Sequence, residues 1–140
     1  MRIAVLASTR GTDLQAIIDE IKVGRLKNVE IACVVSNIKN CYAVERAHSH
    51  GIKTHFVDPK EKSRIEFDRE MALILKNEKV DLIVLVGYMR ILTPYFVGEF
   101  KGKIINVHPA LLPKFGGENF FGQSVHEAVL AAHESETGMT

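Results

Sequence analysis

The 140-residue sequence has no tryptophan, two cysteines and no long uninterrupted apolar segment. Cys33 lies inside an apolar stretch and Cys41 beside a predicted turn, which gives neither a disulfide framework nor the ligand spacing of a metal site. A membrane span needs about 20 consecutive apolar residues, and the apolar start of the chain is too short for a signal peptide. We therefore predict a cytoplasmic protein with two free thiols and no bound metal.

The sequence also has no marked excess of positive or of negative charge. Lysine and arginine together number 18 and aspartate and glutamate 17, which gives a formal net charge of +1. Because nucleic-acid-binding surfaces collect basic residues on one face, this scattered balance argues against a nucleic-acid partner and leaves room for a small anionic ligand. The expected partners are small molecules, and the oligomeric state stays open.

Segments with the hydrophobic pattern of strands alternate with segments of helical periodicity. Strands are predicted at residues 2–7, 29–35, 53–57, 80–86 and 104–107. Helices are predicted behind them, the first ending at Gly24 and the others over residues 42–50, from a Ser63–Glu66 capping box onward, from Thr93 to about Phe100, and over about residues 123–133. Apolar strands in such an alternation are typical of parallel sheets. We predict a single α/β domain with an open, mostly parallel Rossmann-like sheet and helices on both faces.

Ligands of open parallel sheets bind beyond the carboxyl ends of the strands, near the point where the strand order reverses. This rule selects three candidate ligand loops, over residues 8–13, 87–92 and 108–117. The second strand ends in Ser36 and Asn37, so the acidic residue that an NAD ribose needs is missing there.

The first candidate loop has features of a phosphate site. Gly11 permits a tight turn, and Thr12 and Gln15 have the spacing of a capping box. Free backbone N–H groups at the start of the following helix would suit a phosphate, although a capped turn without a ligand accounts for the pattern about equally well. The loop lacks the Walker pattern and the full glycine pattern of dinucleotide-binding loops.

The second candidate loop carries apolar side chains where solvent would favour polar ones. Met89, Ile91 and Leu92 fit a flat aromatic ligand, although packing at the edge of the core is the commoner explanation for such residues. Arg64 stands in the first turn of a predicted helix, where the helix dipole disfavours a cation. It either meets a carboxylate ligand or is an ordinary exposed arginine, which is the commoner case.

Two polar residues close the last predicted strand. Residues 104–107 predict a buried strand, so Asn106 and His108, two residues apart, would project to one side. Pro109 favours an extended conformation at His108. An amide donor beside an imidazole suits acyl chemistry, because the amide stabilises an oxyanion and the imidazole carries a proton near neutral pH. A strand that simply ends in polar residues is the commoner alternative on spacing alone.

The segments Ile105-Asn-Val-His-Pro-Ala-Leu-Leu-Pro113 and Gly87-Tyr-Met-Arg-Ile-Leu92, together with residues 8–15, resemble the phosphoribosylglycinamide formyltransferase family. The resemblance spans the whole chain in the order and spacing of the family. It implies transfer of a formyl group from the co-substrate 10-formyltetrahydrofolate to the amine of 5'-phosphoribosylglycinamide, in de novo purine biosynthesis and without a metal.

The same resemblance implies roles for the matching residues. The backbone of Gly11, Thr12 and Asp13 would hold the phosphate of the glycinamide ribonucleotide. Asn106 would contact both substrates and would be catalytic together with His108. The residues implied for folate binding are Arg64, Met89, Arg90, Ile91, Leu92 and Asn106.

The sequence departs from the commonest family pattern at Thr9, Asp13, Ala110 and Gly116, where glycine, asparagine, serine and proline are frequent. Thr9 and Ala110 are mild changes. Asp13 puts a negative charge beside the implied phosphate, and Arg10 would offset it.

The family pattern continues past Thr140 with a strand and a catalytic aspartate that orients the histidine. We therefore expect the sequence to be either the N-terminal part of a longer enzyme or a short form with altered activity. In a short form, a carboxylate from within the sequence, such as Glu118 or Glu127, would have to replace the aspartate.

Related Asn-x-His-Pro-x-Leu-Leu-Pro motifs occur in methionyl-tRNA formyltransferase and in formyltetrahydrofolate hydrolase, so both stay alternatives. The first would need a basic RNA-binding extension, and the second usually carries a further N-terminal domain. A non-catalytic nucleotide- or folate-binding fragment is a third alternative, which an assay of formyl transfer against ligand binding would separate from an enzyme.

Overall fold

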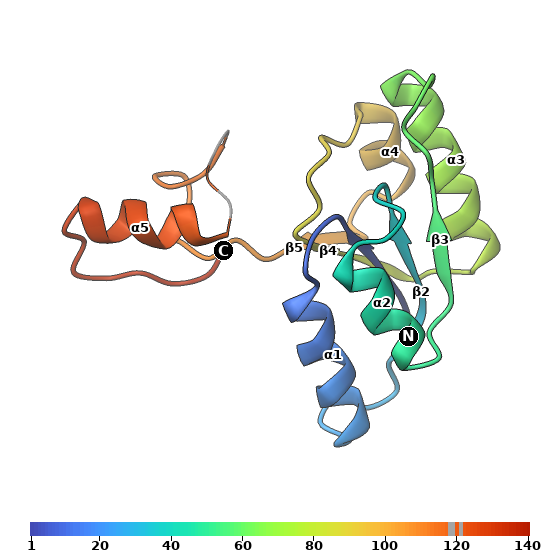
Figure 1. Cartoon of the computed structure of the whole chain (residues 1–140), viewed down its shortest axis with the longest axis horizontal. Helices are drawn as coiled ribbons and strands as arrows, with labels where there is room; N and C mark the ends of the chain where they lie inside the picture. The colour runs from blue at the N-terminus through green and yellow to red at the C-terminus, as the bar shows by residue number, and fades with distance from the viewer. Residues whose placement is uncertain (118–119, 121) are drawn as a thin grey trace. The chain divides into compact units, whose positions relative to one another are not determined.

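The computed structural model describes residues 1–117, 120 and 122–140, which form two compact units over residues 1–105 and 106–140 (Figure 1). The elements of the first unit are β1 (Arg2–Ala7), α1 (Thr12–Lys22), β2 (Glu30–Ser36), α2 (Tyr42–Ser49), β3 (Thr54–Phe56), α3 (Arg64–Asn77), β4 (Leu82–Val86) and α4 (Pro94–Glu99). The strand β5 (Ile104–Asn106) ends in the first residue of the second unit, which also contains α5 (Gln123–Ala131). This order is the predicted alternation of strands and helices.

Within the described residues, β1 lies at the centre of a five-stranded sheet with the order β3-β2-β1-β4-β5. β1 pairs in parallel with β2 and with β4, and β2 pairs in parallel with β3. Because β1 and β4 are neighbours in the sheet but distant in the chain, the strand order reverses between them. The predicted parallel α/β sheet is confirmed, and its switch point lies between β1 and β4.

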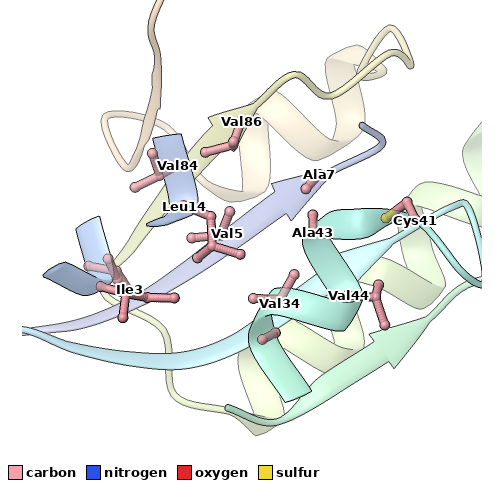
Figure 2. Close-up of a cluster of buried hydrophobic side chains, with 12 residues drawn as sticks. Ile3, Val5, Ala7, Leu14, Val34, Cys41, Ala43, Val44, Val84 and Val86 are labelled. Carbon is pink, nitrogen blue, oxygen red and sulfur yellow. The ribbon is translucent and has the colours of Figure 1, made fainter. Parts of the chain in front are cut away.

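Two apolar layers cover the sheet, one on each face. Alternate residues of β1 point to opposite faces, so Val5 belongs to one layer and Leu6 to the other. The first layer packs α1 and α2 against the sheet, with Leu14 near Val5 and Ala43 near Ala7 (Figure 2). The second layer packs α3 and α4 against the opposite face around Phe67. The predicted arrangement of helices on both faces is therefore confirmed.

Most element bounds lie within two residues of the prediction. The predicted capping box starts α3, because the Ser63 hydroxyl accepts from the Glu66 N–H at 3.3 Å and the Glu66 carboxylate accepts from the Ser63 N–H at 2.8 Å. The predicted start of α4 is also correct, since Thr93 caps it and Pro94 is its first residue. Among the described residues, no helix combines the length and apolar character needed to cross a bilayer.

The prediction of a buried strand over residues 104–107 is wrong. β5 ends at Asn106, and Ile105 and Val107 are 47% and 40% exposed. The physical reason is the position of β5 at the edge of the sheet. Ile104 packs with the layer of α3 and α4, whereas the layer of α1 and α2 reaches no further than β4. An apolar sequence predicts the strand but does not tell which of its faces is covered.

Both cysteines are buried free thiols, as the sequence predicts. Burial raises the pKa of the Cys33 thiol to about 12, and the negative charge of Glu78 adds to this shift. Cys33 is therefore neutral at physiological pH and acts as an apolar part of the core.

Candidate functional site

The loop between β1 and α1 is fixed by the first turn of α2. Gly11 is the N-cap of α1 and has φ 66° and ψ 37°, in the left-handed region that glycine tolerates. A Cβ at this position would lie 2.7 Å from the Cβ of Ala43 and 2.9 Å from its Cα. The Ala43 N–H also donates to the Thr9 carbonyl at 3.2 Å. Both the backbone conformation and the neighbouring helix therefore require glycine here.

The first N–H groups of α1 are open to a ligand. The first bond of the helix runs from the Gln15 N–H to the Gly11 carbonyl at 3.1 Å. No described residue accepts from the N–H groups of Thr12, Asp13 or Leu14. Since N–H groups at the start of a helix attract anions, this geometry supports a phosphate site. Thr12 also lines a hollow of about 310 Å³, together with Arg10, Tyr42 and Arg46.

The predicted capping box at Thr12 and Gln15 is wrong. Gly11 is the N-cap, Thr12 is the first helical residue, and no side chain caps this helix. Gln15 instead donates to the Asp19 carboxylate at 2.9 Å and accepts from Nη1 of Arg46 at 3.2 Å. A serine or threonine cap would occupy one of the first N–H groups, so the glycine cap leaves them available.

Ser8 and Thr9 join the first loop to the loop after β4. The Ser8 N–H donates to the Gly87 carbonyl at 3.3 Å, and the Met89 N–H donates to the Ser8 hydroxyl at 3.0 Å. That hydroxyl donates to the side-chain oxygen of Asn37 at 2.6 Å. The Thr9 hydroxyl lies too close to the place of a Cβ on residue 87 for a side chain to fit there without a shift. The chain segments that follow β1, β2 and β4 are therefore held together at the carboxyl ends of these strands.

Arg64 and the loop after β4 line a second hollow, of about 210 Å³. The loop contributes Met89, Arg90 and Ile91, so four of the residues that the resemblance implies for folate binding line the same hollow. Met89 and Ile91 are 46% and 77% exposed. A hollow lined by exposed apolar side chains and two arginines suits a ligand that has a flat apolar part and anionic groups.

Leu92 and Arg90 of the second loop also contact the core of the protein. Leu92 is partly buried against the layer of α3 and α4, and among the described residues it is not part of the hollow's lining. The Arg90 guanidinium lies 4.2 Å from the centre of the Phe67 ring, which is cation–π distance. Leu92 thus packs the loop against the core, and the Phe67 ring contacts the Arg90 side chain.

A buried carboxylate anchors the end of this loop. Asp68 on α3 is 3% exposed and accepts from the Thr93 N–H at 2.7 Å and from the Thr93 hydroxyl at 2.6 Å. The Thr93 hydroxyl accepts in turn from the Phe96 N–H at 3.4 Å. The sequence analysis missed Asp68. Its spacing of three residues from Met71, on the apolar face of a predicted helix, was the available clue.

We expect Asp68→Ala to lower the free energy of unfolding by roughly 2–4 kcal/mol, because it leaves the partly buried Thr93 donors without their acceptor. Denaturant unfolding measures the loss. Glu70→Ala is the matched control, since Glu70 lies on the same helix and pairs with Lys62 at the surface. The free energy of unfolding of Glu70→Ala should fall by less than about 1 kcal/mol. Equal losses in the two variants would contradict the anchoring role of Asp68.

In the second unit, His108 is held through its backbone and through its ring. Its N–H donates to the Thr140 carbonyl at 2.8 Å, and its carbonyl accepts from the Thr140 N–H at 2.9 Å. Nε2 of the ring lies 2.6 Å from the Phe115 carbonyl oxygen. Because a carbonyl only accepts, Nε2 donates in this hydrogen bond, and Nδ1 is the ring nitrogen left for another partner. The orientation of the ring is thus defined.

Asn106 is exposed at the end of β5, two residues before His108. The joint projection of these two side chains stays a prediction, since the regular strand does not extend to His108. Of the two internal carboxylates considered above, Glu118 lies outside the described residues, and Glu127 accepts from the Gln123 amide at 3.0 Å on α5.

Comparison with known proteins identifies the family of this fold and these loops. Residues 1–140 match the family described as formyl transferase. The chain belongs to the formyl transferase family. Phosphoribosylglycinamide formyltransferase of Haemophilus influenzae is 41% identical over 140 residues, which cover 99% of this chain and 63% of that protein. The resemblance noted in the sequence is confirmed, and this formyl transferase family member spans 63% of the length of that curated relative.

Solved structures agree with the membership in the formyl transferase family. Phosphoribosylglycinamide formyltransferase from Bacillus halodurans superposes with a TM-score of 0.88 at 35% identity, over 100% of this chain and 70% of that one. The same enzyme from Coxiella burnetii, in complex with CHES, gives a TM-score of 0.90 at 40% identity, over 99% and 63% of the two chains. The fold is therefore that of these formyl transferases.

Proposed function

We propose that this protein transfers a formyl group from 10-formyltetrahydrofolate to the amine of 5'-phosphoribosylglycinamide, a step of de novo purine biosynthesis. The observation that carries the proposal is the match of the whole chain to formyl transferases. Two hollows beside the loops that follow β1 and β4 support it, because they offer separate places to a phosphorylated acceptor and to a folate.

The acceptor phosphate is proposed to lie on the backbone of Gly11, Thr12 and Asp13. The open N–H groups at the start of α1 support this, as does the positive charge of Arg10 on the hollow next to them. Asp13 is exposed in the first helical turn, where the helix dipole favours a carboxylate. Its side chain need not face the phosphate for the backbone to bind it.

The folate is proposed to lie against Arg64 and the loop after β4. Met89 and Ile91 offer apolar contact to its ring system, and the Arg64 and Arg90 guanidinium groups can pair with its carboxylates. Leu92 would support this loop from the core side. Asn106 is proposed to contact both substrates, as the family resemblance implies.

Asn106 and His108 are proposed to stabilise the transition state. The lone pair of the glycinamide amine attacks the formyl carbon, and the carbonyl oxygen becomes an oxyanion. The Asn106 amide and a proton on Nδ1 of His108 donate to this oxyanion, while Nε2 stays bonded to the Phe115 carbonyl. The bond between the formyl carbon and N10 then breaks, N10 takes up a proton, and the former amine loses one. The atoms balance without a covalent intermediate on the protein.

The test is to follow the absorbance change from 10-formyltetrahydrofolate to tetrahydrofolate with the purified protein, with and without glycinamide ribonucleotide. We expect conversion only when both substrates are present. Conversion without the acceptor would favour the hydrolase alternative. Calorimetric binding of both ligands without turnover would favour a non-catalytic binding protein, and formylation of methionyl-tRNA in place of the ribonucleotide would favour the tRNA enzyme.

A further inference from the structure

We propose that Arg46, on α2, is a positioning residue for the acceptor phosphate, because its guanidinium locks the loop that presents the open N–H groups of α1. The inference rests on the proposed function, since it concerns how the same site binds glycinamide ribonucleotide. Arg46 belongs neither to the motifs that carry the family resemblance nor to the residues assigned to a substrate above.

α2 holds three successive residues of the first loop. The Ala43 N–H donates to the Thr9 carbonyl at 3.2 Å, Nε of Arg46 donates to the Arg10 carbonyl at 2.9 Å, and Ala43 closes the space beside Gly11. Of these contacts, only the hydrogen bond from Arg46 to the Arg10 carbonyl is donated by a side chain. Its removal would free the middle of the loop while the backbone bond at Thr9 remains.

Arg46 also ties the loop to the helix that follows it. Its Nη1 donates to the side-chain oxygen of Gln15 at 3.2 Å, and the Gln15 N–H bonds to the Gly11 carbonyl at 3.1 Å. The planar guanidinium thus bridges a backbone carbonyl before the helix and a side chain in its first turn. Two acceptors in a fixed relation match the rigid donor fork of arginine, which a lysine ammonium cannot reproduce.

This bridge matters for an anion because the N–H groups at a helix start act together only when the preceding loop keeps its conformation. A loop that must be ordered during binding lowers affinity by the cost of that ordering. Arg46 also lines the hollow with Arg10 and Thr12, so it adds positive charge to the space beside the N–H groups. Both effects concern the acceptor and leave the folate contacts at Arg64 unchanged.

The experiment measures the affinity of variants for glycinamide ribonucleotide and for 10-formyltetrahydrofolate by calorimetry, with inorganic phosphate as a competitor. Arg46→Met should weaken ribonucleotide binding by about tenfold or more and change folate binding less than about twofold. Arg46→Lys keeps the positive charge but not the bridge, so its affinity for the ribonucleotide should fall severalfold. Gln15→Leu keeps Arg46 but removes the side-chain oxygen that accepts from it, so the affinity for the ribonucleotide should also fall severalfold.

Arg25→Met is the matched control, because Arg25 pairs with Glu20 on the exposed surface near the other end of α1. It should bind both ligands normally. Unchanged ribonucleotide affinity in Arg46→Met would overturn the positioning role and leave the proposed function intact. A parallel loss of both affinities with a lower melting temperature would also overturn it, since Arg46 would then be a general structural residue. No ribonucleotide binding by the parent protein would instead overturn the proposed function, and this inference with it.

Discussion

Replacing His108 with alanine should lower kcat by about 10²–10³ and leave the KM of both substrates nearly unchanged. The proposed contact from Nδ1 strengthens as the formyl oxygen becomes an oxyanion, so its loss raises the barrier more than it weakens substrate binding. Steady-state kinetics with each substrate varied in turn measures the two effects separately.

Two further variants show whether the effect comes from the imidazole ring of His108. His108→Gln retains an amide that can donate to the Phe115 carbonyl but carries no titratable proton, so it should be nearly as slow as the alanine variant. His126→Ala is the control, because His126 is an exposed histidine on α5 in the same unit, and it should keep full turnover. Near-normal turnover in His108→Ala would return His108 to a structural role.

Gly11→Ala should lower the affinity for glycinamide ribonucleotide by about tenfold or more, because the loop that presents the N–H groups must shift and be reordered on binding. The new Cβ would lie 2.7 Å from the Cβ of Ala43, so the loop or α2 must move. The variant should also lose roughly 2–4 kcal/mol of stability, from left-handed backbone strain and overpacking together. Calorimetry and denaturant unfolding measure the two losses.

Gly24→Ala separates backbone strain from crowding. Gly24 has φ 73°, close to the φ of 66° at Gly11, but a Cβ there would meet nothing within 4 Å. The control should therefore lose only about 1–2 kcal/mol and bind the ribonucleotide normally. If Gly11→Ala behaves in the same way as Gly24→Ala, the contact with Ala43 is not what requires glycine.

The regular part of the fold could be predicted because it depends on local periodicity. β1 was predicted with its full extent, and the capping box at Ser63 defined the start of α3. The exposure of Ile105 could not be predicted, because it depends on how far the layer of α1 and α2 extends across the described sheet. The cap at Gly11 was missed because glycine and threonine both suit a helix start, and the choice depends on the position of Ala43.

The same distinction holds for the candidate site. The hollow that joins Arg64 to Met89 and Ile91 matches the set of residues that the family resemblance implied. Asp68 and Arg46 were missed, because each acts on groups that come near only in the folded chain. Asp68 meets a threonine 25 residues away, and Arg46 meets a backbone carbonyl 36 residues away. Every residue has a backbone carbonyl and nearly every residue a backbone N–H, so a sequence does not show which of them a distant side chain contacts. Such contacts are found only in a structure.

The packing of Thr9 against Gly87 constrains how this protein can vary during evolution. Residue 87 has φ 54°, and the Thr9 hydroxyl lies too close to the place of a Cβ there. A side chain at position 87 would therefore be strained in its backbone and would displace the Thr9 hydroxyl. Position 9 belongs to the loop proposed for the acceptor, and position 87 begins the loop proposed for the folate. A substitution at position 87 in the second loop would thus have to be accommodated by position 9 in the first loop.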